Sequence, residues 1–198
     1  MTKTKGKSGL ISSGFWGRKW LVQACLCLAI SNMPVAHAFA HTENVQLLKA
    51  AYIFNFAKFT SWPEHIWKEN NASLNLCITG KDGLVSKLEQ LTGKVIQEHP
   101  VIVQLVKNPQ NMKQCHLLYI ATSEKNHYQT ILKSVQNEPV LTVSELPQFG
   151  RSGGIIELYR EKEKTRFIIN LDTARESGLT ISSRLLNLAR IINNETAP

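Results

Sequence analysis

The chain has 198 residues, of which 43 % are hydrophobic and 19 % are charged. This balance predicts one globular domain and excludes a disordered chain, a collagen-like chain and a charge-rich coiled coil. The formal net charge of +8 would suit nucleic-acid binding, but residues 1–40 contain five of the 23 basic residues and none of the 15 acidic ones. The rest of the chain has a net charge of only +3 and no basic stripe, so we expect no nucleic-acid partner.

The first 40 residues have the pattern of a secretory signal. A basic, polar stretch is followed by an apolar run at 20–30, which is shorter than the roughly 20 apolar residues that a membrane span needs. Pro34 and small residues in two Ala-x-Ala frames come next. We therefore predict a signal peptide at 1–38, cleaved within about two residues of this boundary. The mature domain at 39–198 is then exported and does not itself span the membrane.

Helical and extended patterns alternate along the mature chain. They predict helices at 43–59, 83–91, 171–176 and 182–192, a further helix after Ser123, and strands at 74–79, 101–106, 117–121, 139–143, 155–159 and 166–170. The charged turn between the last two strands predicts a hairpin. This order is typical of an α/β fold. We expect a single domain with a mixed, mostly parallel sheet, helices on both faces and a late antiparallel hairpin at one edge.

Cleavage would remove Cys25 and Cys27 and leave Cys77 and Cys115. Two cysteines in an oxidising compartment favour a disulfide, and two free buried thiols are the alternative. Neither cysteine lies in a Cys-x-x-Cys frame, so we do not expect a catalytic thiol. The closely spaced ligand pairs of a zinc site are also missing.

The sequence contains none of the common motifs of catalytic and cofactor sites. It has no Gly-x-Gly-x-x-Gly after a strand, no Walker loop, no Gly-x-Ser-x-Gly elbow and no His-Glu-x-x-His frame. Nothing supplies a nucleophile, a base and an orienting group together. We therefore predict no catalytic residues, no metal and no cofactor, and hence a binding protein rather than an enzyme.

Six segments occur together in one order. They are LLKAAYIFNFAKFTSWP, LNLCITG, CHLLYIA, PVLTVSE, GGIIELY and RFIINLDTARESGLTISSRLLNLARII. Over residues 47–192 the chain resembles the YfiR family of periplasmic proteins. The most specific segments are Asn55–Phe59 with Trp62-Pro63, Gly153-Gly154, and Ile181–Leu186.

The resemblance implies a periplasmic homodimer that binds and inhibits the sensor region of an inner-membrane diguanylate cyclase. Cyclic di-GMP and biofilm formation would then stay low. It also implies a Cys77–Cys115 disulfide, whereas the second cysteine pair of some members is missing between Gln148 and Ile156. A periplasmic small-ligand binding protein, with a pocket near the first and last helices, is the alternative function.

Two cations lie in the family-like segments beside otherwise apolar helices. Lys58 and Arg184 could hold an anionic ligand, and a structural salt bridge to a carboxylate is the alternative we favour.

The predicted hairpin carries the candidate residues for partner binding. An edge hairpin can present one apolar face, and exposed faces of this kind often mark interfaces. The resemblance agrees, because it places the inhibitory surface in the C-terminal half. The alternative is that the domain's own helices and a second copy cover both faces. The candidates are Ile155, Ile156, Glu157, Phe167 and Ile169.

Overall fold

The structure is a computed structural model that describes residues 35–67 and 72–194. The chain divides into two compact units, 1–42 and 43–198, and the second unit is described below. Most of the predicted signal peptide lies outside the described residues, so its cleavage stays a prediction. The first described helix, α2 (Val35–Lys58), begins earlier than the expected residue 43. The segment before Glu43 is rich in alanine, the strongest helix former, which accounts for the earlier start.

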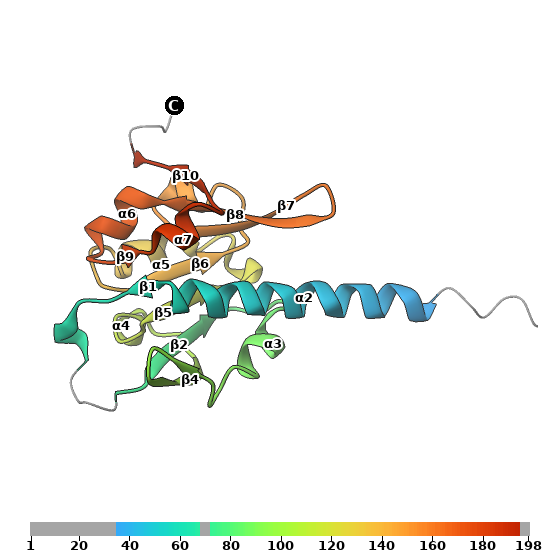
Figure 1. The fold of residues 1–198 in the computed structure, drawn as a ribbon, viewed down its shortest axis with the longest axis horizontal. Helices are drawn as coiled ribbons and strands as arrows, with labels where there is room; N and C mark the ends of the chain where they lie inside the picture. The colour runs from blue at the N-terminus through green and yellow to red at the C-terminus, as the bar shows by residue number, and fades with distance from the viewer. Residues whose placement is uncertain (1–34, 68–71, 195–198) are drawn as a thin grey trace, which may run out of the picture. The chain divides into compact units, whose positions relative to one another are not determined.

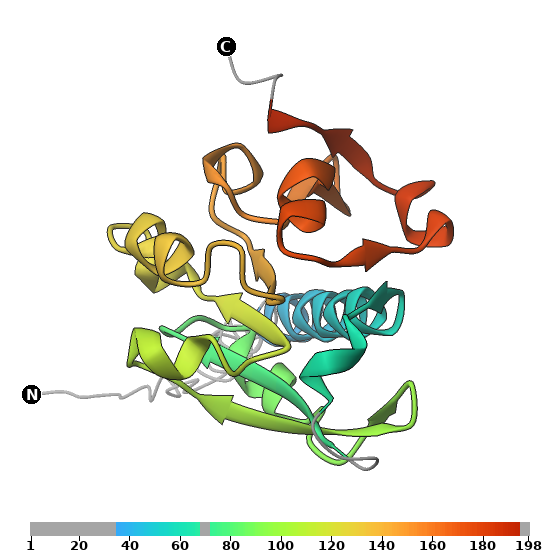
Figure 2. The same ribbon diagram turned by 90° about the vertical axis from the view of Figure 1, so that its left-hand side faces the viewer.

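Most of the described strands form an eight-stranded main sheet in the order β10-β8-β7-β6-β5-β2-β4-β3 (Figures 1 and 2). Only the β7–β8 and β3–β4 pairs are antiparallel, which confirms the mixed, mostly parallel sheet. The strands are β2 (Leu74–Thr79), β3 (Val95–Ile96), β4 (His99–Leu105), β5 (Leu117–Ile120), β6 (Leu141–Ser144), β7 (Ile156–Glu161), β8 (Lys164–Asn170) and β10 (Arg190–Ile192).

Helices cover both faces of this sheet, as expected. Neighbouring residues along a strand point to opposite faces, so each central strand contributes to two cores. Tyr119 belongs to the core beneath α2 and α3, and Leu118 belongs to the core beneath α4 and α5. The remaining helices are α3 (Val85–Glu89), α4 (Pro109–Met112), α5 (Tyr128–Ser134), α6 (Leu171–Glu176) and α7 (Ser183–Leu186), with short 3-10 turns η1 (Glu64–Ile66), η2 (Thr122–Glu124) and η3 (Gly150–Ser152).

The predicted hairpin is present as β7 and β8, which pair from Ile156↔Ile169 to Glu161↔Lys164. Lys162 and Glu163 form its turn, with φ angles of 45° and 46°. Positive φ at both central residues gives the turn the right twist to join two antiparallel strands. The hairpin therefore projects from the sheet as a short arm, visible in Figure 1.

The prediction of a last helix over 182–192 is wrong beyond its first turn. After α7 the chain forms β10, which pairs in parallel with β8 from Arg190↔Ile168. Helical spacing of the leucines suggested a continuous helix, but the open side of β8 offers backbone partners that the sequence alone does not reveal. The β-branched Ile191 and Ile192 suit a strand. The hairpin is thus next to the sheet edge, and β10 forms that edge.

A two-residue ladder outside the main sheet joins the two ends of the domain. β1 (Thr60–Ser61) pairs antiparallel with β9 (Thr180–Ile181). Beside this ladder, the Ser182 backbone N–H donates to the Phe59 carbonyl at 2.9 Å. The end of α2 is therefore fixed next to the start of α7.

Candidate functional site

The carboxyl ends of the parallel strands form the edge where open α/β sheets bind ligands. After β2 the chain forms β4 on one side of β2 and then β5 on the other side of β2. The connections therefore run in opposite directions along the sheet from the point between β2 and β5. Polar residues follow three neighbouring strands at this edge. They are Asp82 after β2, Thr122 after β5 and Glu145 after β6. This edge is therefore the candidate site.

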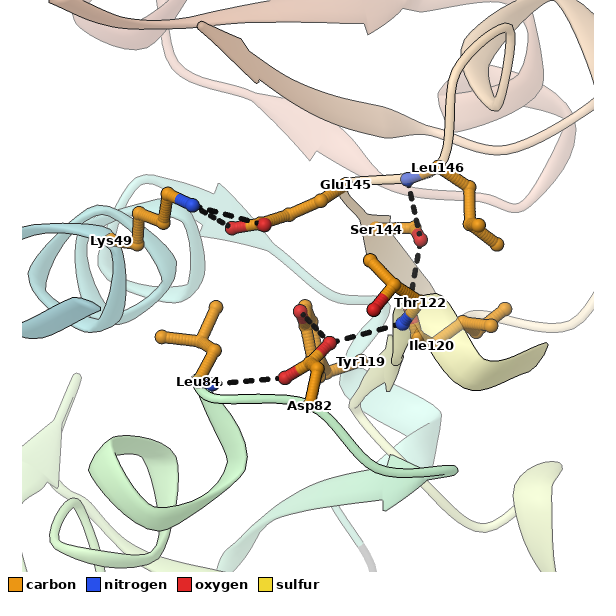
Figure 3. Close-up of polar contacts among 9 residues, drawn as sticks. All are labelled: Lys49, Asp82, Leu84, Tyr119, Ile120, Thr122, Ser144, Glu145 and Leu146. Atoms are coloured by element: carbon orange, nitrogen blue, oxygen red, sulfur yellow. Dashed lines mark hydrogen bonds and ion pairs between the residues drawn. The ribbon is translucent and has the colours of Figure 1, made fainter. Parts of the chain in front are cut away.

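Asp82 is the centre of a hydrogen-bond network at this edge (Figure 3). Its Oδ2 accepts from the Tyr119 hydroxyl at 2.7 Å and from the Thr122 backbone N–H at 3.0 Å. Its Oδ1 accepts from the Leu84 backbone N–H at 2.9 Å. Burial and the Asp82 carboxylate raise the pKa of Tyr119 far above its ordinary value, so the hydroxyl stays a donor. The network therefore holds the loops after β2 and β5 in place rather than presenting a reactive group.

A salt bridge links α2 to the same edge. The Lys49 ammonium lies 2.8 Å from Oε1 and 3.0 Å from Oε2 of Glu145, and both side chains are mostly buried. Next to it, the Ser144 hydroxyl donates to the Ile120 carbonyl at 2.6 Å and accepts from the Leu146 N–H at 3.1 Å (Figure 3). The protein's own groups thus engage these polar atoms. We interpret the network as a structural support for a binding surface.

A hollow of about 680 Å³ lies beside this network, at the ends of β2 and β4. Its lining combines the apolar side chains of Val85, Leu105 and Val106 with a charged rim that includes Lys81 and Glu124. An apolar floor with a few polar groups is typical of a small-molecule or peptide pocket.

The turn that shapes this hollow requires a glycine. Gly80 has a φ of +83°, and a Cβ at this position would lie 2.5 Å from the Ser123 Oγ. That hydroxyl already accepts from the Lys81 N–H at 2.8 Å. The backbone conformation and the close approach therefore both favour glycine.

A second cavity, of about 440 Å³, lies between α5 and α6. Hydroxyl and amide groups dominate its lining, including Thr142, Ser152, Gln136 and Asn137. Neither of these two cavities lies between α2 and α7, where the sequence predicts a pocket.

The hairpin residues expected to bind a partner are all buried. The Phe167 ring lies 4.9 Å from the Phe56 ring and 5.8 Å from the Tyr52 ring, measured between centroids. The expectation that these side chains form an exposed apolar face is therefore wrong, because α2 covers the base of the hairpin. The structure shows the part of the alternative in which the domain's own helix covers these residues, and coverage by a second copy stays a prediction. The five buried residues are Ile155, Ile156, Glu157, Phe167 and Ile169.

The two candidate cations are exposed, at neighbouring ends of the β1–β9 ladder. The Lys58 carbonyl accepts from Gln97 Nε2 at 2.9 Å, and the Arg184 backbone N–H donates to the Ser182 hydroxyl at 3.3 Å. Across residues 35–67 and 72–194, neither side chain forms the favoured salt bridge. The structure thus brings their backbones together and leaves the side chains facing solvent.

Cys77 and Cys115 form the expected disulfide, with a Cα–Cα distance of 5.8 Å. Both sulfurs lie in the core beneath α4 and α5 and are almost completely buried. The bond connects β2 to the segment that leads into β5. The alternative of two free thiols is therefore excluded by the structure.

Sequence reasoning missed a cluster of aromatic and imidazole rings next to this disulfide. The Trp67 ring stacks on His99 with centroids 3.8 Å apart and on His116 with centroids 4.5 Å apart. Trp62 Nε1 donates to the His116 carbonyl at 3.1 Å, and the Asn75 N–H donates to His116 Nδ1 at 3.0 Å. These residues are far apart in the sequence, so spacing could not reveal the cluster.

His116 is held in its neutral form. Burial, with a smaller contribution from neighbouring His99, lowers the pKa of His116 to about 4. Nδ1 accepts a backbone hydrogen bond and therefore carries no proton. The imidazole serves as a fixed hydrogen-bond acceptor rather than as a base exposed to a substrate.

A family model described as YfiR/HmsC-like matches residues 46–190, which include every element from β1 to β9. Within the described part of the chain, no group of three or more His, Cys, Asp or Glu side chains could hold a metal ion. No helix among the described residues has the length and apolarity required to cross a bilayer.

Proposed function

The chain belongs to the YfiR/HmsC-like family, and from this premise we propose that it binds and inhibits the periplasmic sensor region of an inner-membrane diguanylate cyclase. The family match is the single observation that carries the proposal. A buried disulfide is consistent with export to an oxidising compartment. The protein acts by binding and not by catalysis, and the expected homodimer belongs to the same proposal.

The β7–β8 arm is the contact surface we propose for the cyclase. Its buried base fixes the position of the arm, and its exposed tip reaches the partner. At the tip, Arg160 pairs with Glu163, and Arg166 pairs with Glu161 at 3.7 Å. Lys162 and Lys164 form no ion pair with any described residue. These two ammonium groups fit an acidic patch on the partner, since charge complementarity steers association and fixes the register of an interface.

The test combines a gene deletion with complementation. Deletion should raise cellular cyclic di-GMP, and the wild-type gene should restore the low level. The double charge reversal Lys162→Glu with Lys164→Glu should fail to restore it, at unchanged periplasmic abundance and with an unchanged circular dichroism spectrum. Lys125→Glu, at an exposed lysine after η2, is the matched control and should repress fully.

Two results would count against the proposal. An unchanged cyclic di-GMP level after deletion would refute the regulatory function. A double reversal that represses as well as wild type would instead move the contact away from the arm and leave the regulatory function intact.

A small-ligand binding function is the second candidate. The hollow of about 680 Å³ at the ends of β2 and β4 favours it, because open α/β sheets place their ligands at this edge. Binding there should raise the melting temperature of the wild-type protein and not that of Gly80→Val, which fills the turn. Metabolite fractions that change neither melting temperature would argue against this function.

A further inference from the structure

The β4 strand is open on the side that faces away from β2. β3 covers only its beginning, where Ile96 pairs with His99 and Val95 with Pro100. The Val101 N–H also donates to the Lys94 carbonyl at 2.7 Å. In the sheet formed by the described residues, no strand lies beside the remainder of β4.

The hydrogen-bonding pattern shows which backbone groups this open side presents. The N–H and C=O of one residue in a parallel strand point to the same side, and the sides alternate along the strand. Val106 donates to Ile78 of β2, whereas Val101 points to β3. Val103 and Leu105 must therefore point outward, in phase with Val101. Their N–H and C=O groups are not used by any strand of the described sheet.

Apolar side chains accompany these open backbone groups. Leu105 is 62 % exposed, Ile102 is 46 % exposed, and Val95 of the adjacent β3 is 61 % exposed. Proteins normally protect an edge strand with charges, prolines or bulges, because an open edge pairs with other strands. An edge that is both apolar and unpaired therefore indicates an interaction surface.

The open part of β4 has the same order of side-chain types in both directions along the chain. Ile102-Val103-Gln104-Leu105-Val106 reads as two apolar residues, an amide and two apolar residues in either direction, and it contains no charge. In an antiparallel pair centred on Gln104, Val103 of one copy lies opposite Leu105 of the other. These residues then exchange about four backbone hydrogen bonds. The two Gln104 side chains meet at the axis, where their amides can bond to each other.

We propose that β4 is the self-association surface of this protein, and that two copies pair antiparallel about a two-fold axis through Gln104. A symmetric interface uses the same patch on both copies, and this uncharged segment brings no like charges together when it pairs with itself. The inference rests on the homodimer included in the proposed function, and it is independent of the cyclase as partner.

Local structure limits the paired segment to 102–106. β3 occupies the side of β4 before Ile102, and beyond Val106 the chain turns away toward α4. A pairing this short predicts a dimer whose population depends on protein concentration.

Opposite charges at the axis provide the test. Gln104 is exposed, and its Nε2 makes only a weak hydrogen bond of 3.4 Å to Cys77 Sγ, so charged replacements should leave the fold intact. Gln104→Lys alone and Gln104→Asp alone each place two like charges face to face and should raise the dimer dissociation constant by more than about tenfold. An equimolar mixture should form the heterodimer, because Lys and Asp then meet across the axis. Leu188→Lys, at a residue 70 % exposed near the opposite edge, is the control and should dimerise like wild type.

Sedimentation velocity over a concentration series gives the readout, and circular dichroism verifies folding. A monomeric wild type at about 100 µM would overturn the proposal, and so would single charged variants that dimerise like wild type. Hydrogen exchange on wild type is a second measurement that needs no variant. The Val103 and Leu105 amides should gain protection as concentration rises, and unchanged exchange in a dimeric sample would also overturn the proposal. Cyclic di-GMP in cells carrying these variants tests the cyclase proposal separately.

Discussion

The two halves of the sheet are held together by different means. In the half built from β4, β2 and β5, a disulfide joins Cys77 to Cys115. In the half built from β6, β7, β8 and β10, buried side chains hold the backbone instead. The Glu157 carboxylate accepts from the Gly150 N–H at 3.0 Å, Asn170 Nδ2 donates to the Gly150 carbonyl at 2.9 Å, and the Thr142 hydroxyl accepts from the Ile155 N–H at 2.9 Å.

These side-chain hydrogen bonds hold backbone groups between Gln148 and Ile156, the stretch where the family resemblance implies a second cysteine pair in some members. Gly150 belongs to η3, between Gln148 and Ile156, and both of its backbone groups are engaged. A disulfide stabilises mainly by restricting the unfolded chain, whereas a buried hydrogen bond stabilises by satisfying polar groups of the folded one. The two halves of the sheet are therefore stabilised by two kinds of constraint, a disulfide in one and buried side-chain hydrogen bonds in the other. The two halves should then respond differently to substitution, reductant and pH.

Removal of the disulfide should have the largest effect. For a loop of this size, the double variant Cys77→Ala with Cys115→Ala should lower the free energy of unfolding by about 4 kcal/mol. Urea denaturation of both proteins without reductant gives the difference. A loss below about 1 kcal/mol would mean that the bond does not stabilise its half of the sheet.

Asn170→Ala should have the next largest effect, in the other half. This 2 % exposed side chain donates to Gly150 and Asn194 and accepts from the Thr173 N–H, so truncation leaves buried groups without partners. We expect a loss of about 2–3 kcal/mol, with or without reductant. Exposed Asn187→Ala is the control and should change stability by less than about 0.5 kcal/mol. An equal loss in both variants would contradict the role of Asn170.

Acidification should weaken the disulfide half through His116. The pKa of His116 is near 6.5 in the unfolded chain and about 4 in the folded protein. Between these values the unfolded state binds the extra proton, so stability falls as pH falls from 6.5 to 4, by on the order of 2 kcal/mol. His116→Gln should show a shallower pH dependence of the urea midpoint over this window. Parallel curves for the two proteins would show that His116 does not titrate as described.

Glu157→Gln should have the smallest effect. The amide oxygen of glutamine can still accept from the Gly150 N–H, although a neutral acceptor bonds less strongly than a carboxylate. We expect a loss of about 1 kcal/mol or less in the free energy of unfolding. A loss above about 3 kcal/mol would show that the negative charge itself stabilises this half.

Local sequence patterns were sufficient to predict the elements whose conformation depends mainly on their own residues. The strand at Leu74–Thr79 and the helix at Leu171–Glu176 have the predicted bounds. The hairpin was also predicted correctly, because its charged turn separates two apolar strands. The disulfide was predicted from the two cysteines that lie after the predicted signal peptide and from the family resemblance.

Features that depend on distant partners could not be predicted in this way. β10 forms because the free side of β8 is available, although the leucine spacing before it is helical. Burial of Phe167 depends on Phe56 of α2, which is remote in the sequence. Asp82 had a local signal, since an aspartate two residues before Leu84 can form a side-chain turn. Its bond to Tyr119 required the three-dimensional structure.

The burial of the disulfide should make its reduction in the folded protein slow. Cys77 is 0 % exposed and Cys115 is 3 % exposed, so a dissolved thiol can reach the bond only when the surrounding strands separate. Such openings of a core region approach the free energy of global unfolding and are therefore infrequent. We therefore expect the oxidation state of Cys77 and Cys115 to be set while the chain folds and to change only slowly afterwards. The oxidation state of the pair in each molecule should then reflect the redox conditions under which that molecule folded. The average oxidation state of the population should change mainly as new molecules are made.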